Sequence, residues 1–323
     1  MISGAICIQV RIRAGVASSR EYILQITAFH LLGFATSFAM VGICTALALG
    51  GGSDPLTVVT LRTLGTVALF LAWFRIVGVP LAMPARERAL ALAIGIPLCI
   101  NNYLINLAIA EIPVPLVVLL FYLWPAITTA ASWMLGKERF GWMRLAGLAT
   151  AFAGVALALN VDFTAAQMKG VWLAIGAAVA WSVTFLLTSH VFHGRDTRPA
   201  TLHMTLTAAA VFVAACLISG EFNLPETFSG WAGVLGVPFF YAFAMIGLFT
   251  ATARLGPMRV GFYMNFEPIA AVVLAVLILG QRLEPVQLAG GALVVAALFI
   301  FRPVKPTSGG KPRSASARSS RRG

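Results

Sequence analysis

Two charged side chains, Arg62 and Glu267, stand well inside long apolar stretches of this sequence. Glu267 is ~12 Å along a helix from Arg259, and Arg62 is ~9 Å from Pro55, which mark the nearer ends of those stretches. For Glu267 we expect either proton transfer or a contact with the ammonium group of a bound molecule; the alternative is a structural carboxyl held by donors beside Pro268. Arg62 would clamp a carboxylate with its planar fork, and the alternative is a guanidinium that snorkels to the helix end.

The most polar patch in any apolar stretch is formed by amides. Asn102 and Asn106 stand one helical turn apart and share a helix face, with Asn101 and Tyr103 beside them. Contact of such a patch with lipid is unfavourable, so we expect it between helices. There the amides either line a cavity and bind a substrate's polar end or hydrogen-bond neighbouring helices.

Aromatic residues are further candidates for the walls of a binding site. Tyr122 and Trp124 lie deep in their stretch, beside Pro125, where an interfacial anchor is not expected. Their rings would offer a stacking surface for an aromatic group or a π-face for a cation. The remaining candidates of this kind are Trp181, Tyr241 and Tyr263.

Four prolines stand inside apolar stretches at related places: Pro97, Pro125, Pro238 and Pro268. Each removes a helical hydrogen bond. We interpret them either as hinges that bend during a working cycle or as static kinks that help helices pack.

Metal and cofactor sites are not expected. His190 and His193 share a spacing that suits one helix face, but no third ligand follows them. The four cysteines are isolated from one another, which predicts free thiols.

Composition places these residues in a membrane. Of the 323 residues 59% are apolar and 11% are charged, with a mean hydropathy of +0.90. Stretches of this length and apolarity are typical of membrane-spanning helices, and no strand-like alternation is present. We therefore predict an all-α integral membrane protein of ten transmembrane helices. The predicted spans are residues 24–49, 56–76, 89–110, 114–135, 144–160, 170–190, 200–219, 231–253, 260–280 and 286–301.

The basic residues predict the orientation. With the N-terminus inside, Lys and Arg gather in the inner loops, whereas the outer loops hold only Lys169 and Arg282 among several acids. Both termini are therefore expected in the cytoplasm. The formal charge of +12 then reflects topology, and no nucleic-acid partner is expected. We predict a cytosolic leader over residues 1–20 and a disordered basic cytoplasmic tail over 303–323.

A shift of 143 residues lays the second half of the chain on the first. The coincidences are Pro125 with Pro268, Arg139 with Arg282, residues 145–147 with 288–290, Gly33 with Gly176, and Phe38 with Trp181. One offset across several spans predicts a duplication, with units at 21–160 and 161–302. Each unit has five spans, an odd number, so the second would be inverted relative to the first, as in many secondary transporters.

Small residues form ridges in the last span of each predicted unit. Gly147, Ala151 and Gly154 stand at helical spacing in one, and Gly290 and Ala297 in the other. Such ridges let helices approach closely. We expect these two spans to pack on each other within the chain, the alternative being a seam between two chains; a monomer is the expected state.

Several motifs resemble one known family. They are Arg62 in the second span, Trp124-Pro125 followed by Leu135-Gly136-Lys137-Glu138, and Glu267-Pro268 followed by Leu279-Gly280-Gln281. Together they resemble the EamA-type drug/metabolite transporter superfamily over roughly residues 24–301, although Trp124 and Gln281 stand where its pattern has acids. The run from Phe121 to Pro125 is most similar to the YddG type of amino-acid exporter. The resemblance implies export of aromatic and other neutral amino acids from the bacterial cytoplasm across the inner membrane.

Other classes of protein fit less well. The sequence has no phosphate-binding GxxxxGK[ST] loop, no GxSxG and no HExxH, so neither an ATP-driven pump engine nor an enzyme is expected. We predict a secondary active transporter of amino acids or related metabolites that works by alternating access. The alternatives are an exporter of drugs or of another substrate class and a channel-like facilitator. The expected partners are the lipid bilayer and a small-molecule substrate such as an amino acid.

The orientation is testable with reporter tags. Tags at residue 323 and in the loop around Arg195 should both report the cytoplasm, and a tag near Asp162 should report the periplasm, because Lys and Arg gather on the inner side. A periplasmic signal from residue 323 would contradict the even number of spans.

Overall fold

The computed structural model describes residues 29–134, 165–193, 195–255 and 263–300, together with 146, 147, 149, 150, 153, 154, 157 and 260. Within these ranges the chain is helical, and no strand occurs. The predicted span 144–160 lies almost wholly outside these ranges. The predicted leader and tail lie wholly outside them. The ten-helix count and the location of the termini therefore remain predictions.

The helices have the following bounds. They are an N-terminal helix (Phe29–Gly50), α2 (Pro55–Val77), α3 (Ala85–Glu111), α4 (Val114–Phe121), α5 (Trp124–Met134), α7 (Ala165–Val191), α8 (Arg198–Ser219), α9 (Phe228–Leu255), α11 (Glu267–Leu279) and α12 (Pro285–Ile300). Seven helical stretches in the described ranges are long and apolar enough to cross a membrane, with α4 and α5 counted as one, and α11 and α12 are shorter apolar helices. The chain is a multi-pass membrane protein.

Helix ends follow local chemistry. Asp54 caps α2 by accepting hydrogen bonds from the backbone N–H of Thr57 at 2.8 Å and from its hydroxyl at 2.6 Å. The backbone N–H of Asn223 also donates to Asp54, at 3.1 Å, so the start of α2 is tied to the loop before α9. Burial alone would raise the pKa of Asp54, but these hydrogen bonds outweigh it and hold the pKa below its usual value. Gly220 ends α8 with a φ of 70°, a left-handed conformation that glycine adopts without strain.

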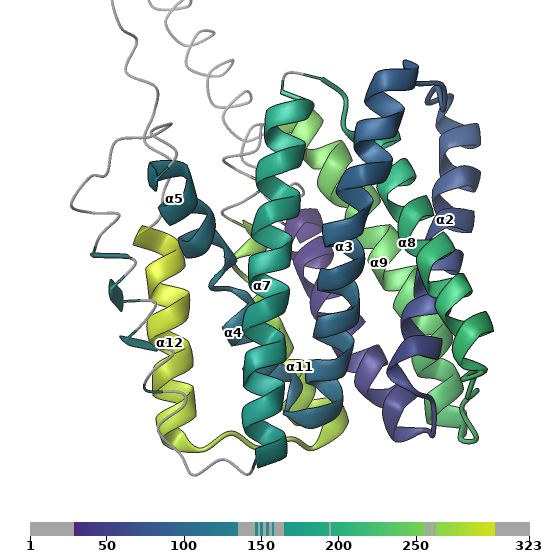
Figure 1. Ribbon diagram of the computed structural model, residues 1–323. Helices are drawn as coiled ribbons and strands as arrows, with labels where there is room; N and C mark the ends of the chain where they lie inside the picture. Colours follow the sequence, from purple (N-terminus) through teal and green to yellow (C-terminus); the bar gives the residue numbers. More distant parts are fainter. Residues whose placement is uncertain are drawn as a thin grey trace, which may run out of the picture.

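The helices pack in a layered bundle (Figure 1), with α2, α8 and α9 at one side, α5 and α12 at the other, and α4, α7 and α11 between them. Helix α2 contacts α8 and α9, and α3 contacts α7 and α8. The 143-residue offset recurs here, because adding it to the first residues of α2, α3 and α5 gives the first residues of α8, α9 and α11. The contacts of α2 with α9 and of α3 with α8 are therefore equivalent under this shift.

Two spans are broken near their middle. The stretch predicted as a single span over 114–135 is divided: α4 ends at Phe121, residues 122 and 123 form a turn, and α5 begins at Trp124. Helix α11 likewise begins at Glu267, after a turn at residues 265 and 266. Pro125 and Pro268 thus lie in the first turn of a new helix, where the missing N–H costs nothing. Pro97 and Pro238, in contrast, lie inside the continuous helices α3 and α9.

Glycines allow the closest helix contacts. A Cβ added at Gly233 of α9 would lie 2.5 Å from the carbonyl oxygen of Cys44 in the N-terminal helix, so nothing larger fits there. A Cβ at Gly154 would lie 2.7 Å from the carbonyl oxygen of Gly290 in α12. This second contact confirms that the two small-residue ridges pack on each other within the chain, at Gly154 and Gly290.

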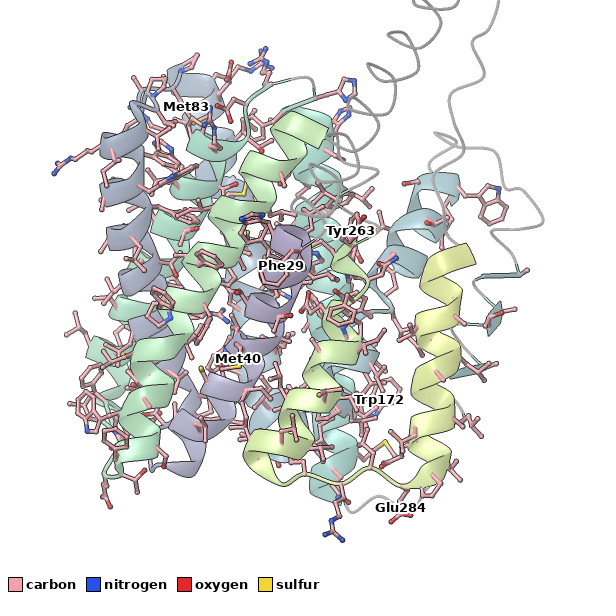
Figure 2. The ribbon with its side chains drawn as sticks, turned by 180° about the vertical axis from the view of Figure 1, so that it is seen from behind. Phe29, Met40, Met83, Trp172, Tyr263 and Glu284 are labelled. Carbon is pink, nitrogen blue, oxygen red and sulfur yellow. The ribbon has the colours of Figure 1, made fainter. Side chains whose placement is uncertain are left out.

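The two ends of the bundle are marked by residues in Figure 2. Glu284 lies at one end, Met83 lies at the other, and Met40 and Trp172 lie between them. By the predicted topology the first end faces the periplasm, and we call it the predicted outer end. The opposite end is the predicted inner end.

Candidate functional site

The two broken spans meet at Tyr122 and Glu267. Tyr122 lies in the turn after α4, is 6% exposed, and its hydroxyl donates to the Glu267 carboxylate at 2.7 Å. The same hydroxyl also lies 3.1 Å from the carbonyl oxygen of Met264, just before the break that precedes α11. Glu267 occupies the first turn of α11, where the positive end of the helix dipole favours a carboxylate. The acid expected to need a partner therefore has one, supplied by the other broken span.

A second bond joins the same two spans at the predicted outer end. The backbone N–H of Val114, in the first turn of α4, donates to the side-chain oxygen of Gln281 at 3.1 Å, and Gln281 follows the end of α11. Nearby, Lys169 forms an ion pair with Glu111 at 2.7 Å. Gln281, the departure from the family pattern, thus satisfies an N–H that the helix itself cannot.

Trp124 lies where the first broken span meets α7. Its carbonyl oxygen accepts a hydrogen bond from the Ser182 hydroxyl at 3.0 Å, and its ring packs on Phe185 with centroids 5.2 Å apart. Trp181 lies next to Ser182 and packs on Phe121, with ring centroids 6.3 Å apart. Trp124 and Trp181 therefore flank the turn that carries Tyr122.

Arg62 is buried between helices. It is 4% exposed, and its guanidinium carbon lies 5.3 Å from the centroid of the Tyr241 ring. Tyr241 in turn meets Phe38 edge to face at 6.2 Å. A side chain that snorkels to the helix end would be exposed, so that alternative is wrong for this conformation.

The three amides have separate roles. The Asn101 side chain donates to the carbonyl oxygen of Ala177 in α7 at 3.0 Å, which is the helix-bonding alternative. The Asn106 side chain donates to the carbonyl oxygen of Asn102 at 2.7 Å. Its own oxygen is fully buried and has no hydrogen-bond partner among the described residues. Asn106 therefore has an acceptor that is open to a further donor.

The charged and aromatic candidates fall into two groups and one outlier. Tyr122, Glu267, Trp124 and Trp181 form one group, and Arg62 and Tyr241 form the other. Phe38 and Trp181 pack on the same buried cluster, which includes Phe70 and Phe74, so aromatic rings connect the groups. Tyr263 instead packs on a separate cluster with Leu31, in the region where Figure 2 shows it close to Phe29.

Sequence reasoning did not identify Ser182 or Phe121 as candidates. Ser182 is the neighbour of Trp181, which the 143-residue offset aligns with Phe38, so this offset was the available signal. Among the residues that the structure describes, no three His, Cys, Asp or Glu side chains gather to hold a metal ion.

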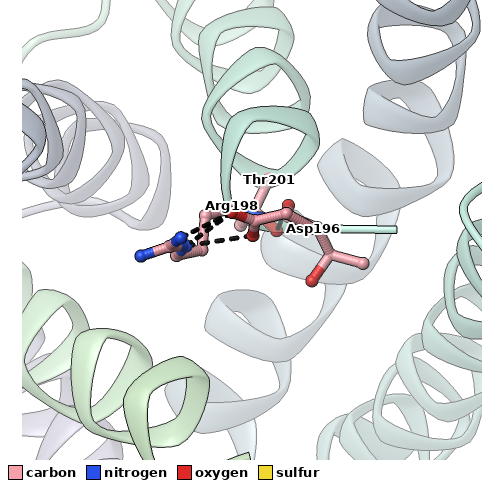
Figure 3. A network of polar contacts seen from close by, with 4 residues as sticks. Asp196, Arg198 and Thr201 are labelled. Atoms are coloured by element: carbon pink, nitrogen blue, oxygen red, sulfur yellow. Dashed lines mark hydrogen bonds and ion pairs between the residues drawn. The ribbon is translucent and has the colours of Figure 1, made fainter. Parts of the chain in front are cut away.

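Charged residues at the predicted inner end form a local network (Figure 3). Arg198, the first residue of α8, binds the Asp196 carboxylate with contacts of 2.6 to 3.0 Å. This hydrogen bonding holds the pKa of Asp196 below its usual value. Arg195 pairs with Glu87 at the start of α3. These contacts fix the loop before α8 and belong to neither group of predicted site residues.

Comparisons with known proteins agree with this architecture. The profile of the EamA-like transporter family matches the chain twice, over residues 25–160 and 168–302. The threonine/homoserine exporter RhtA of Escherichia coli is 29% identical over 248 residues, 74% of this chain and 77% of that protein. A probable terminal-alkyne amino-acid exporter of Streptantibioticus cattleyicolor is 25% identical over 252 residues, 73% of this chain and 84% of that protein.

One solved crystal structure is similar to this chain with a TM-score of 0.58 and 23% identity. The similarity covers 84% of this chain and 96% of that one. At this identity the similarity shows the fold alone.

The bond between Tyr122 and Glu267 is testable by a double-mutant cycle. Tyr122→Phe should lower the free energy of unfolding by about 1 to 3 kcal/mol, because it leaves the carboxyl without its donor. In a Glu267→Gln background the same substitution should cost clearly less. Thermal or denaturant unfolding of the purified protein in detergent measures both effects.

Tyr103→Phe is the matched control, since Tyr103 is exposed at 36% and should tolerate the change. Additive effects of the Tyr122 and Glu267 substitutions would show that the two side chains are not coupled.

Proposed function

The chain belongs to the EamA-like transporter family, and from this premise we propose that it is a secondary transporter that exports amino acids or related small metabolites. The expected location is the bacterial inner membrane, and the expected substrates are aromatic and other neutral amino acids. RhtA of Escherichia coli is named as an exporter of threonine and homoserine. The protein of Streptantibioticus cattleyicolor is named as a probable exporter of terminal-alkyne amino acids. Their names support the substrate class proposed here.

The observation that carries this proposal is the meeting of the two broken spans at Tyr122 and Glu267. Broken helices in a membrane occur where they are covered by protein or line a water-filled pathway, and they commonly mark transporter sites. Tyr122 donates to one oxygen of the Glu267 carboxylate, and the proposal assigns the other oxygen to a ligand or a proton. We assign to Glu267 either the binding of the substrate ammonium group or the uptake of a proton that drives transport.

Charges and rings together suit an amino acid. Arg62 supplies a cation and Glu267 an acid, and rings connect the two groups through Phe38 and Trp181. A zwitterion has one charge for each group. Trp124 and Tyr122 would then contact the side chain of the substrate, which favours apolar and aromatic amino acids. Asn102 and Asn106 would hydrogen-bond its polar atoms.

Alternating access requires two packings of similar energy, and an inverted duplication supplies them. The family profile matches twice, and the helices of the two matched segments start at equivalent positions. These observations support the proposed pair of inverted five-helix units. The broken starts of α5 and α11, together with Pro97 inside α3 and Pro238 inside α9, are the proposed points of bending.

The test is counterflow in proteoliposomes. Vesicles loaded with an unlabelled amino acid should accumulate the labelled one, and an outwardly directed pH gradient should change the rate if protons are coupled. Phenylalanine, threonine and methionine form a suitable panel. Uptake that does not saturate would indicate a pore, and no uptake of any amino acid would contradict the proposal.

Glu267→Gln separates the two roles of the carboxyl. If Glu267 carries the coupling proton, exchange should persist while its response to the pH gradient disappears, because the amide neither gains nor loses a proton. If Glu267 binds the ammonium group, exchange itself should fall by about tenfold or more, the loss expected for a charged hydrogen bond. A variant that matches the parent in both respects would show that the carboxyl is structural.

A further inference from the structure

Most buried threonines of the described helices bond their own backbone, and Thr66 does not. In membrane helices the threonine hydroxyl commonly bonds the carbonyl four residues earlier, and Thr60, Thr63 and Thr205 do so at 2.7, 3.0 and 2.8 Å. Thr66 is 0% exposed, yet its hydroxyl has no hydrogen-bond partner among the described residues, as is also the case for Thr45 and Thr128. The residue four positions earlier is Arg62. A buried hydroxyl that forgoes its own helix leaves a hydrogen bond to be made elsewhere.

Arg62 is left unsatisfied in the same way. One terminal nitrogen of its guanidinium, Nη2, is buried and finds no hydrogen-bond partner in the described part of the chain. Arg62 takes part in none of the ion pairs that the described residues form. The ring of Tyr241 covers it but cannot accept as an anion does. A buried guanidinium without a counter-ion is costly, so the position is explained best by a ligand that supplies the charge.

The contacts of α2 with α9 place the guanidinium on the Thr66 side of Arg62. The two helices run in the same direction, because their starts are joined by the bond from the Glu226 N–H to the Gly51 carbonyl at 2.8 Å. A Cβ at Gly65 would lie 2.6 Å from Pro238, so these residues are level. Tyr241 is one turn further along α9. Since the guanidinium reaches the Tyr241 ring, it extends along α2 in the direction of Thr66.

We propose that Arg62 and Thr66 form a buried anion-binding site, which takes the carboxylate of the transported substrate. A carboxylate has two oxygens, so it accepts from the guanidinium and from the hydroxyl together and satisfies both. A small inorganic anion such as chloride could supply the same negative charge and is the alternative occupant of the site. This inference rests on the proposed function and deepens it, since a substrate would then need a carboxylate, and cationic drugs or simple amines would be rejected.

Access to this site requires movement. Arg62 Nη2 and the Thr66 hydroxyl are both closed off from solvent in this conformation. Pro238 packs on Gly65 beside them. Because a proline donates no backbone hydrogen bond, α9 has one hydrogen bond fewer to break when it bends at Pro238. Bending of α9 at Pro238 would expose the pair.

The first experiment compares substrates that differ by one group. Counterflow and thermal stabilisation of the purified protein are measured with phenylalanine and with phenethylamine, which lacks only the carboxylate. The parent should exchange phenylalanine and should neither bind nor exchange phenethylamine. Equal handling of both compounds would overturn the carboxylate assignment.

The second experiment uses matched variants. Thr66→Val should weaken phenylalanine binding by about tenfold, the loss of one hydrogen bond to a charged group. Thr63→Val is the control, because Thr63 is equally buried on the same helix and its hydroxyl is already bonded to Val59 and Thr60. It should change binding by less than about twofold. Equal losses in the two variants would overturn the site.

Arg62→Met provides a readout that does not depend on transport. Replacing an unpaired buried charge should raise the melting temperature of the ligand-free protein while abolishing stabilisation by phenylalanine. Unchanged stabilisation by phenylalanine in this variant would overturn the site.

A chloride titration, with gluconate as the replacement anion, separates the two sources. Stabilisation of the parent by chloride, absent in Arg62→Met and Thr66→Val, would support the site with an inorganic occupant. If no amino acid is exchanged and this chloride effect remains, the proposed function fails and the anion site stands. If amino acids are exchanged and neither variant differs from the parent, the site fails and the function stands.

Discussion

A polar group in the hydrocarbon core of a membrane has no water to bind, and the structure is organised by this constraint. The helices satisfy the backbone, and hydroxyls such as those of Thr60 and Thr63 return to their own helix. Glu267 is satisfied by Tyr122 from the other broken span. The buried side chains with an unpaired polar atom within the described residues are Thr45, Ser53, Arg62, Thr66, Asn106 and Thr128, and the proposed anion site accounts for two of them.

The same constraint explains why the two breaks face each other. A helix that stops in mid-membrane leaves N–H and C=O groups open, and a proline just after the break reduces the number of open N–H groups. The two turns also place Tyr122 and Glu267 where one completes the other. Val114 and Gln281 repeat this arrangement at the predicted outer end. The broken spans are thus held at two points, by the Tyr122 hydroxyl at one and by a single hydrogen bond at the other.

Much of this arrangement follows from the sequence. Apolar length predicts the spans, and the 143-residue offset predicts that α5 and α11 begin at equivalent positions. The depth of Glu267 predicts that it needs a partner. The sequence does not indicate which partner, because Tyr122 and Glu267 are distant along the chain and meet only through packing of α4 against α11. Thr66 could not be singled out for a similar reason, because only the structure shows that its hydroxyl lacks the backbone bonds that Thr63 makes within the described residues.

The central claim is that the two broken spans, joined here, separate during transport. Spin labels at Pro113→Cys and Arg282→Cys flank the bond between Val114 and Gln281 and leave both partners in place. In a background without the native cysteines, the distance between the labels should be measured by pulsed electron resonance in lipid, with and without the transported amino acid. We predict a short distance and a second, longer one whose populations change when the amino acid is added. A single short distance under all conditions, in protein that still exchanges amino acids, would contradict the account.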